Sequence, residues 1–227
     1  MNRLFAYCFP ILLFPVVALA QPQRDTKYGA SLAAEVEKSL LRNLNLSVEE
    51  EIRLINNQTG FNRNVTSAGF NYSLMDKKLK LGASYSFIYL YNNDFRYEMR
   101  HRLHANVTFR ETVGPFVLSW RTRIQESIRN PRRGSYRVNP RYVLKNRLEA
   151  EYVIWGKPWK PFLSCEMSIN LNDPQTRYDP TRLRFCGGAD WRLNRSTSLS
   201  LFIRWDEQLK GADPRVIAPG ISYKVRM

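Results

Sequence analysis

The chain has 227 residues and a formal net charge of +15, from 35 Lys and Arg against 20 Asp and Glu. This length suits one domain, and the strongly basic balance indicates an anionic partner. After residue 20 no stretch is long and apolar enough for a transmembrane helix, so any membrane span in that part of the chain must be made of strands.

The first predicted element is an export signal. Arg3 precedes the nearly continuous apolar run 4–19, and residues 18–20 (Ala-Leu-Ala) supply the small residues of a cleavage site. This pattern predicts a secretory signal peptide over residues 1–20, because the run is short for the alternative, a membrane anchor helix. For an exported chain nucleic acid is the wrong anionic partner, and phosphorylated outer-leaflet glycolipid (lipopolysaccharide) is a better one.

The N-terminal segment 21–43 is ambiguous. Tyr28, Leu32 and Val36 fall on one side of an alternation with polar or small residues, which predicts a strand. The Ala, Leu, Glu and Lys residues of the same segment also suit a short helix. The segment is therefore either an extra strand or a short helix.

From Leu44 onward the chain alternates apolar and polar side chains in successive segments. In the clearest segment, 97–110, Leu103 and Phe109 share a face opposite Arg100 and Arg102. Successive side chains of a strand point to opposite faces, so each segment has one apolar face and one charged face. Strands are predicted near residues 44–55, 63–74, 79–90, 97–110, 116–128, 141–154, 160–171, 181–193, 197–208 and 215–226.

The connections between these segments alternate in length. Short turns are expected at 75–78, 112–115, 156–159 and 194–196, and longer loops at 56–62, 91–96, 129–140, 172–180 and 209–214. Outer-membrane barrels have short periplasmic turns and longer outer loops. The sequence therefore predicts an all-β fold in the bacterial outer membrane: an antiparallel up-and-down transmembrane β-barrel of about 10 strands (10–12 possible) over residues 44–227. A soluble periplasmic β-sandwich or lipocalin-like binding protein is the alternative.

The apolar faces are expected to contact lipid. They contain Leu79, Leu81, Ala83, Tyr85, Phe87, Tyr89, Phe116, Leu118, Trp120, Ile124, Leu183, Phe185, Ala189, Trp191, Leu199, Leu201, Ile203 and Trp205. Tyr and Trp lie near several strand ends, as in the aromatic girdles of barrels. Glu50 is an exception between Val48 and Ile52, so either a bulge shifts the phase there or the residue lies near the membrane interface.

The charged faces are expected to line the barrel lumen. They contain Glu49, Glu51, Arg53, Glu98, Arg100, Arg102, Arg121, Arg123, Gln125, Lys145, Arg147, Glu149, Glu151, Glu166, Arg184, Asp190, Arg204, Asp206 and Lys224. The favoured interpretation is a structural charge network that fills the interior. A narrow, largely occluded, porin-like channel that prefers anions is the alternative, because barrels of about eight strands are filled by side chains while much larger ones hold channels.

Candidates for chemistry are few. His101 and His104 lie three apart on one strand, so they face opposite ways and cannot share a metal ion; neither a metal site nor a cofactor is expected. Cys165 and Cys186 could lie opposite one another, but their alternation places them on different faces, which argues against a disulfide. No catalytic residue is predicted and the protein is not expected to be an enzyme. The alternative is a lipid-modifying barrel enzyme, which would require His104 to meet a serine and a carboxylate.

The densest basic cluster lies in the loop 129–134. Arg129, Arg132 and Arg133 could contact lipid phosphates or acidic sugars at the outer leaflet. A solvated loop is the equally favoured alternative.

Five stretches of the chain carry a family resemblance: LSVEEEIR (46–53), RHRL (100–103), NRLEAEY (146–152), WKPFLSCE (159–166) and PGISYKV (219–225). In these stretches the chain resembles domain of unknown function 2490, a family of bacterial outer-membrane proteins common in the Bacteroidota. The resemblance implies an outer-membrane barrel of unknown role, and it supplies no catalytic residue. For this small barrel we expect a structural or adaptor role. The expected partners are outer-membrane lipid, lipopolysaccharide and the barrel-assembly machinery, although the chain ends in Met227 rather than the usual aromatic residue.

Overall fold

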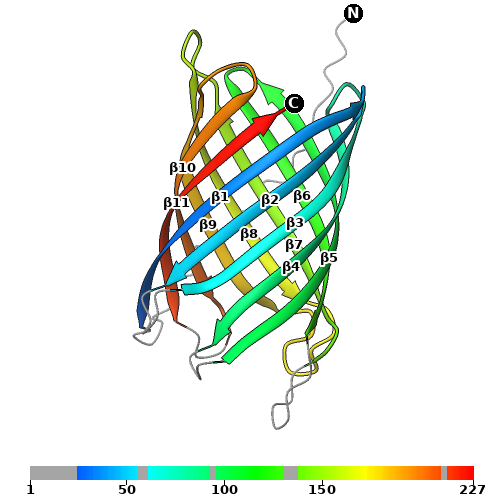
Figure 1. The fold of residues 1–227 in the computed structure, drawn as a ribbon, viewed down its shortest axis with the longest axis vertical. Helices are drawn as coiled ribbons and strands as arrows, with labels where there is room; N and C mark the ends of the chain where they lie inside the picture. The colour runs from blue at the N-terminus through cyan, green and yellow to red at the C-terminus, as the bar shows by residue number, and fades with distance from the viewer. Residues whose placement is uncertain (1–24, 56–60, 93–95, 130–137, 211–213) are drawn as a thin grey trace, which may run out of the picture.

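The computed structural model describes residues 25–55, 61–92, 96–129, 138–210 and 214–227, which form a closed barrel of tilted strands (Figure 1). The strands are β1 (Thr26–Leu41), β2 (Leu44–Ile55), β3 (Phe61–Leu74), β4 (Leu79–Asn92), β5 (Arg96–Val113), β6 (Phe116–Arg129), β7 (Arg141–Tyr152), β8 (Trp159–Asn170), β9 (Pro180–Arg192), β10 (Thr197–Gln208) and β11 (Arg215–Arg226). The predicted all-β closed barrel is confirmed. In the part of the chain described, no helix has the length and apolar character of a membrane span. The predicted signal peptide lies outside the described residues.

Alternation of apolar and polar residues sets the two faces of the barrel wall. In β5, Leu103 points outward and is 52% exposed, whereas Glu98 points inward and is 7% exposed. The same two-residue period runs through the neighbouring strands, and each of the ten strands predicted from Leu44 onward forms close to its expected bounds. Because the sheet closes on itself, the wall has no free edge whose backbone groups would need other partners.

The N-terminal segment forms an eleventh strand, not a helix. β1 pairs with β2 in antiparallel fashion and with β11 in parallel, so that Ser31 lies opposite Gly220 and Glu35 opposite Lys224. An odd number of strands that alternate in direction must bring the first and the last strand together in parallel. Both arrows point the same way in Figure 1, where β1 is blue and β11 is red.

The connections sort to the two ends of the barrel, but their lengths follow the prediction only in part. One end, here called the short-turn end, holds the connections 42–43, 75–78, 114–115, 153–158 and 193–196 together with Met227. The opposite, long-loop end holds the remaining connections and the start of β1. The expected long loop at 91–96 is wrong, because β4 and β5 extend until only residues 93–95 separate them. Hydrophobic alternation does not show where a strand ends among polar residues, so the sequence did not reveal the full lengths of β4 and β5.

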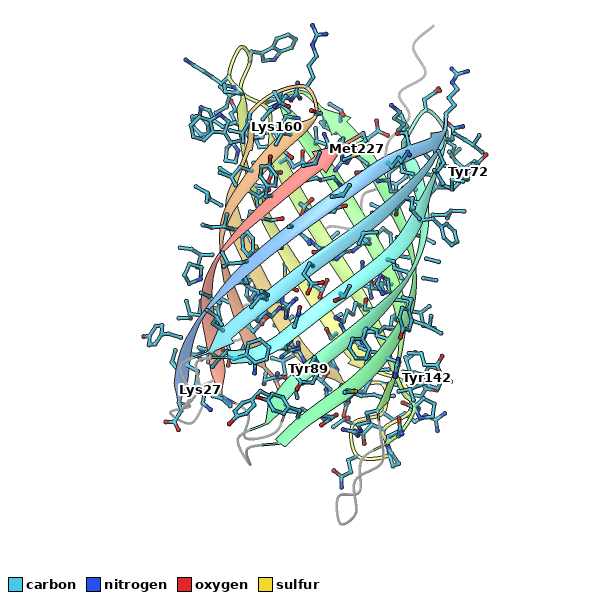
Figure 2. All side chains as sticks on the ribbon, viewed as in Figure 1. Lys27, Tyr72, Tyr89, Tyr142, Lys160 and Met227 are labelled. Carbon is cyan, nitrogen blue, oxygen red and sulfur yellow. The ribbon has the colours of Figure 1, made fainter. Side chains whose placement is uncertain are left out.

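The outer wall is a band of exposed aliphatic residues between two groups of aromatic residues. Tyr72 lies near the short-turn end, and Tyr89 and Tyr142 lie near the long-loop end (Figure 2). Of the two expectations for Glu50, the bulge is wrong, and the position near the membrane interface stays a prediction. Glu50 pairs with Ala34 and Thr66 without a register shift at that position, and it is the seventh of the twelve residues of β2. It therefore faces outward away from both ends of its strand.

Candidate functional site

The interior holds a cavity of about 1030 Å³ that extends inward from the short-turn end. It reaches the rim at Arg42, Lys77 and Arg226 and extends inward to Arg102 and Arg204. All eleven strands contribute lining residues, because every strand turns its polar face inward. The cavity is lined by fourteen Lys and Arg and seven Asp and Glu, an excess of seven positive charges.

The structure places the predicted lumen residues in three groups. Those that line the cavity are Glu49, Glu51, Arg53, Arg102, Arg121, Arg123, Lys145, Arg147, Glu149, Glu166, Arg184, Asp190, Arg204 and Lys224. Glu98, Arg100, Gln125 and Asp206 face inward beyond the cavity, toward the long-loop end, whereas Glu151 bonds to Arg110 near the short-turn rim. The cavity also contains Glu35, Glu37 and Lys80, which the sequence analysis missed. The alternation in 28–37 could have revealed the two glutamates if that segment had been assigned as a strand.

A network of ion pairs crosses the inner end of the cavity. Arg53 donates two hydrogen bonds of 2.7 Å to Glu51, and Glu51 lies 3.5 Å from Arg204. Arg204 in turn lies 3.5 Å from Asp206, which accepts bonds of 2.5 and 3.1 Å from Arg184. Bidentate arginine–carboxylate pairs hold their geometry better than single contacts do, so this network fixes side chains from β2, β9 and β10 in place.

Strand register brings the second part of this network together. Arg147 lies opposite Glu166, Glu166 opposite Arg184, and Arg184 opposite Asp206, in one continuous row across β7 to β10. Glu166 also accepts a hydrogen bond of 3.0 Å from Arg121 of β6 and lies 4.0 Å from Arg184 in the row. The row is a direct consequence of antiparallel pairing, since residues directly opposite each other share a face.

Beyond this network the lumen of the described barrel is packed. Ile88 and Ala218 are each 1% exposed, and Ser31, Val143 and Asn170 are also buried. Asn170 accepts two hydrogen bonds from Arg141 and donates one to Thr176, so polar side chains complete the packing. Ile88 and Val143 were not identified as lumen residues from the sequence, although each shares the phase of the polar residues in its strand.

The two histidines lie on opposite sides of the wall. His101 faces outward, where its Nδ1 lies 2.6 Å from the hydroxyl of Tyr85 and its ring packs beside Phe87. His104 lines the cavity opposite Ser84, but its Nδ1 is buried without a hydrogen-bond partner. The described residues contain no cluster of three or more His, Cys, Asp or Glu that could hold a metal ion.

The cysteines also lie on opposite sides. Cys186 lines the cavity and Cys165 lies in the outward row of β8, and both are free thiols. They occupy neighbouring rows of the β8–β9 ladder, in which Cys165 lies opposite Phe185 and Cys186 opposite Ser164. Alternation therefore predicted their orientation correctly.

Of the three loop arginines singled out from the sequence, the structure places one. Arg129 ends β6, where its backbone NH donates to Asn139 Oδ1 at 3.1 Å and its guanidinium donates to the Val138 carbonyl at 3.2 Å. Arg132 and Arg133 lie outside the described residues. At the same end, on the outer wall, the Tyr142 hydroxyl donates to Glu126 at 3.1 Å.

The fold and the polar lumen define an outer-membrane-type β-barrel. The model of the family described as "Protein of unknown function (DUF2490)" matches residues 30–225, and the chain belongs to this family. No curated protein matches the chain. Among solved structures, the chain is similar to the crystal structure of the beta domain of the Bordetella autotransporter Brka, with a TM-score of 0.45 and 8% sequence identity over 79% of this chain and 82% of that chain.

Proposed function

We propose that this protein is an outer-membrane barrel without enzymatic activity, whose lumen is a one-ended cavity instead of a through-channel. The observation that carries the proposal is the asymmetry of the lumen. The cavity opens at the short-turn end, whereas Ile88, Val143 and Ala218 are packed beyond its inner end. Because short turns face the periplasm in outer-membrane barrels, the cavity opens toward the periplasm. A structural or adaptor role suits a barrel that does not conduct.

The distribution of apolar surface supports membrane insertion. Leu81, Leu103, Trp120 and Ile203 are exposed on the outer wall, while the interior is charged. A lipocalin-like binding barrel would require the reverse arrangement, and a β-sandwich would not close on itself. An integral barrel should stay in the membrane fraction after washing with carbonate or urea. Release into the supernatant would contradict the proposed location.

Planar-bilayer recording tests whether the lumen conducts. We expect no steady single-channel current from the purified protein, because the lumen is packed beyond the ion-pair network. A general porin inserted in the same bilayers is the positive control for detection, and quenching of tryptophan fluorescence by lipid-borne quenchers is the control for insertion. A steady current that prefers anions would favour the alternative, a narrow arginine-lined channel.

The lipid-modifying alternative has less support from the geometry. It requires a histidine with a serine and a carboxylate, whereas His101 contacts Tyr85 and no hydrogen bond joins His104 to either group in the described chain. Mass spectrometry of lipopolysaccharide and phospholipid incubated with the protein should show unchanged acyl chains. Loss or transfer of an acyl chain, abolished by a substitution at His104, would revive an enzymatic role.

The proposed partners follow from the location in the outer membrane. We infer contact with outer-membrane lipid along the apolar band and with lipopolysaccharide at the long-loop end, where Arg129 lies. Assembly by the barrel-assembly machinery follows from the barrel fold itself. Depletion of that machinery in cells should lower the amount of folded protein, whereas unchanged amounts would contradict this inference.

A further inference from the structure

The wall formed by β6 and β7 holds like charges directly opposite one another. Arg121 lies opposite Arg147, and Arg123 lies opposite Lys145. All four side chains line the cavity, and together they form what we call the cationic block. Like charges directly opposite each other in a sheet are destabilising, so the cationic block requires compensating negative charge.

Two carboxylates compensate part of this charge. Glu149 bonds to Arg147. Glu166 contacts Arg121 at 3.0 Å and Lys145 at 3.8 Å. Glu149 therefore compensates Arg147, whereas Glu166 is shared between Arg121 and Lys145.

Arg123 is the member of the cationic block without a carboxylate at ion-pair distance, although Glu166 and Glu49 act on it electrostatically from farther away. No acidic side chain of the described chain lies within ion-pair distance of it, and its Nε is buried without a hydrogen-bond partner. Arg102 of the neighbouring strand β5 lines the same cavity and also has a buried, unpartnered Nε. A buried guanidinium nitrogen without a partner is costly, because it has lost water without gaining a hydrogen-bond acceptor.

We propose that the cavity binds a phosphate-type oxyanion at Arg123, with Lys145 and Arg102 as further contacts. The planar guanidinium group matches the spacing of phosphate oxygens and binds them by paired hydrogen bonds. Arg123 and Lys145 lie opposite each other and Arg102 lines the same cavity, and several cations in one cavity favour a polyvalent anion over a monovalent one. The cavity is large enough for such a ligand, and the basic residues Lys77 and Arg226 at its rim attract anions toward it.

This site goes beyond the proposed function and does not depend on whether the lumen conducts. A soluble phosphate compound could enter directly through the short-turn rim, and a lipid phosphate could enter from the adjoining leaflet. Both sources present the same chemistry to Arg123. Solvation of the arginines by water alone is the competing explanation.

Calorimetric titration of the full chain in uncharged detergent at low salt tests the proposal. The probes are inorganic pyrophosphate and a short-chain phosphatidic acid below its micelle concentration. We expect the wild-type protein to bind at least one probe and Arg123→Gln to bind it at least about tenfold more weakly, as the loss of charge-assisted hydrogen bonds requires. Arg177→Gln, which removes the same charge from the exposed β8–β9 connection, should bind as the wild type does.

The outcomes separate the explanations. Binding of pyrophosphate assigns a soluble source, and binding of phosphatidic acid alone assigns a lipid head group. Failure of both probes to bind, or equal binding by Arg123→Gln and the wild type, overturns the site.

A measurement on the wild-type protein covers the case in which the variant does not accumulate. Phenylglyoxal modifies accessible arginines, and the modified positions are identified by mass spectrometry. The bound probe should slow modification of Arg123 and Arg102 but not of Arg177. Equal rates with and without the probe would overturn the proposal.

Discussion

Replacement of Glu166 by Gln should destabilise the barrel more than any other loss of one cavity carboxylate. The Glu166 side chain is 9% exposed and lies within 4.0 Å of Arg121, Lys145 and Arg184. Arg184 keeps its bidentate contact with Asp206, so Arg121 and Lys145 bear most of the loss. Removal of one partner of a buried ion pair costs about 3–5 kcal/mol. We expect about 3 kcal/mol here, because the cavity gives water access to one side of the site.

Equilibrium unfolding in guanidinium, followed by tryptophan fluorescence, measures this free energy. Glu149→Gln is the matched control: it removes a carboxylate that faces Arg147 alone, and it should cost about 1 kcal/mol. Addition of Lys145→Met to Glu166→Gln should recover part of the loss, because it removes one of the two stranded charges. If Glu166→Gln and Glu149→Gln destabilise the protein equally, the network does not have the shared-carboxylate structure described above.

Three further predictions test the two faces of the wall. Glu50→Leu should raise the free energy of unfolding by about 1–2 kcal/mol in lipid vesicles, because a carboxylate that faces hydrocarbon is destabilising; an unchanged or lower value would show that Glu50 does not face lipid. Gly188→Ala should cost about 1–3 kcal/mol, since its Cβ would lie 2.2 Å from a backbone oxygen of β10. Gly187→Ala is the control with ordinary contacts and should change chemical unfolding little; equal effects would contradict the packing. A charged, water-soluble methanethiosulfonate should modify Cys186 in the cavity and spare Cys165 on the outer wall, as mass spectrometry can determine. Modification of Cys165 but not of Cys186 would contradict the assignment of inward and outward faces.

Alternation by itself determined which face most side chains occupy. The inward position of Arg123, the opposite orientations of Cys165 and Cys186, and those of His101 and His104 all follow from a two-residue period. The ten strands from Leu44 onward follow from the same period, because half-buried strands need one apolar and one polar face. These are local properties of the chain, so the sequence carries them without knowledge of distant partners.

Contacts between distant segments depended on the tertiary structure. The segment 26–41 is a strand because β11 and β2 flank it, although its composition also suits a helix. The register between strands decided that Glu166 lies between Arg147 and Arg184. Neither the strand register nor the closing pair can be read from alternation, because a two-residue slip preserves the pattern.

The cavity required the whole barrel. Its inner end forms where Glu51 of β2 reaches Arg204 of β10 across the two intervening strands, and where Ile88 and Ala218 pack at the long-loop end. The sequence determines that these side chains point inward. The heights at which they meet depend on strand tilt and stagger, which are set only when all eleven strands close into one barrel.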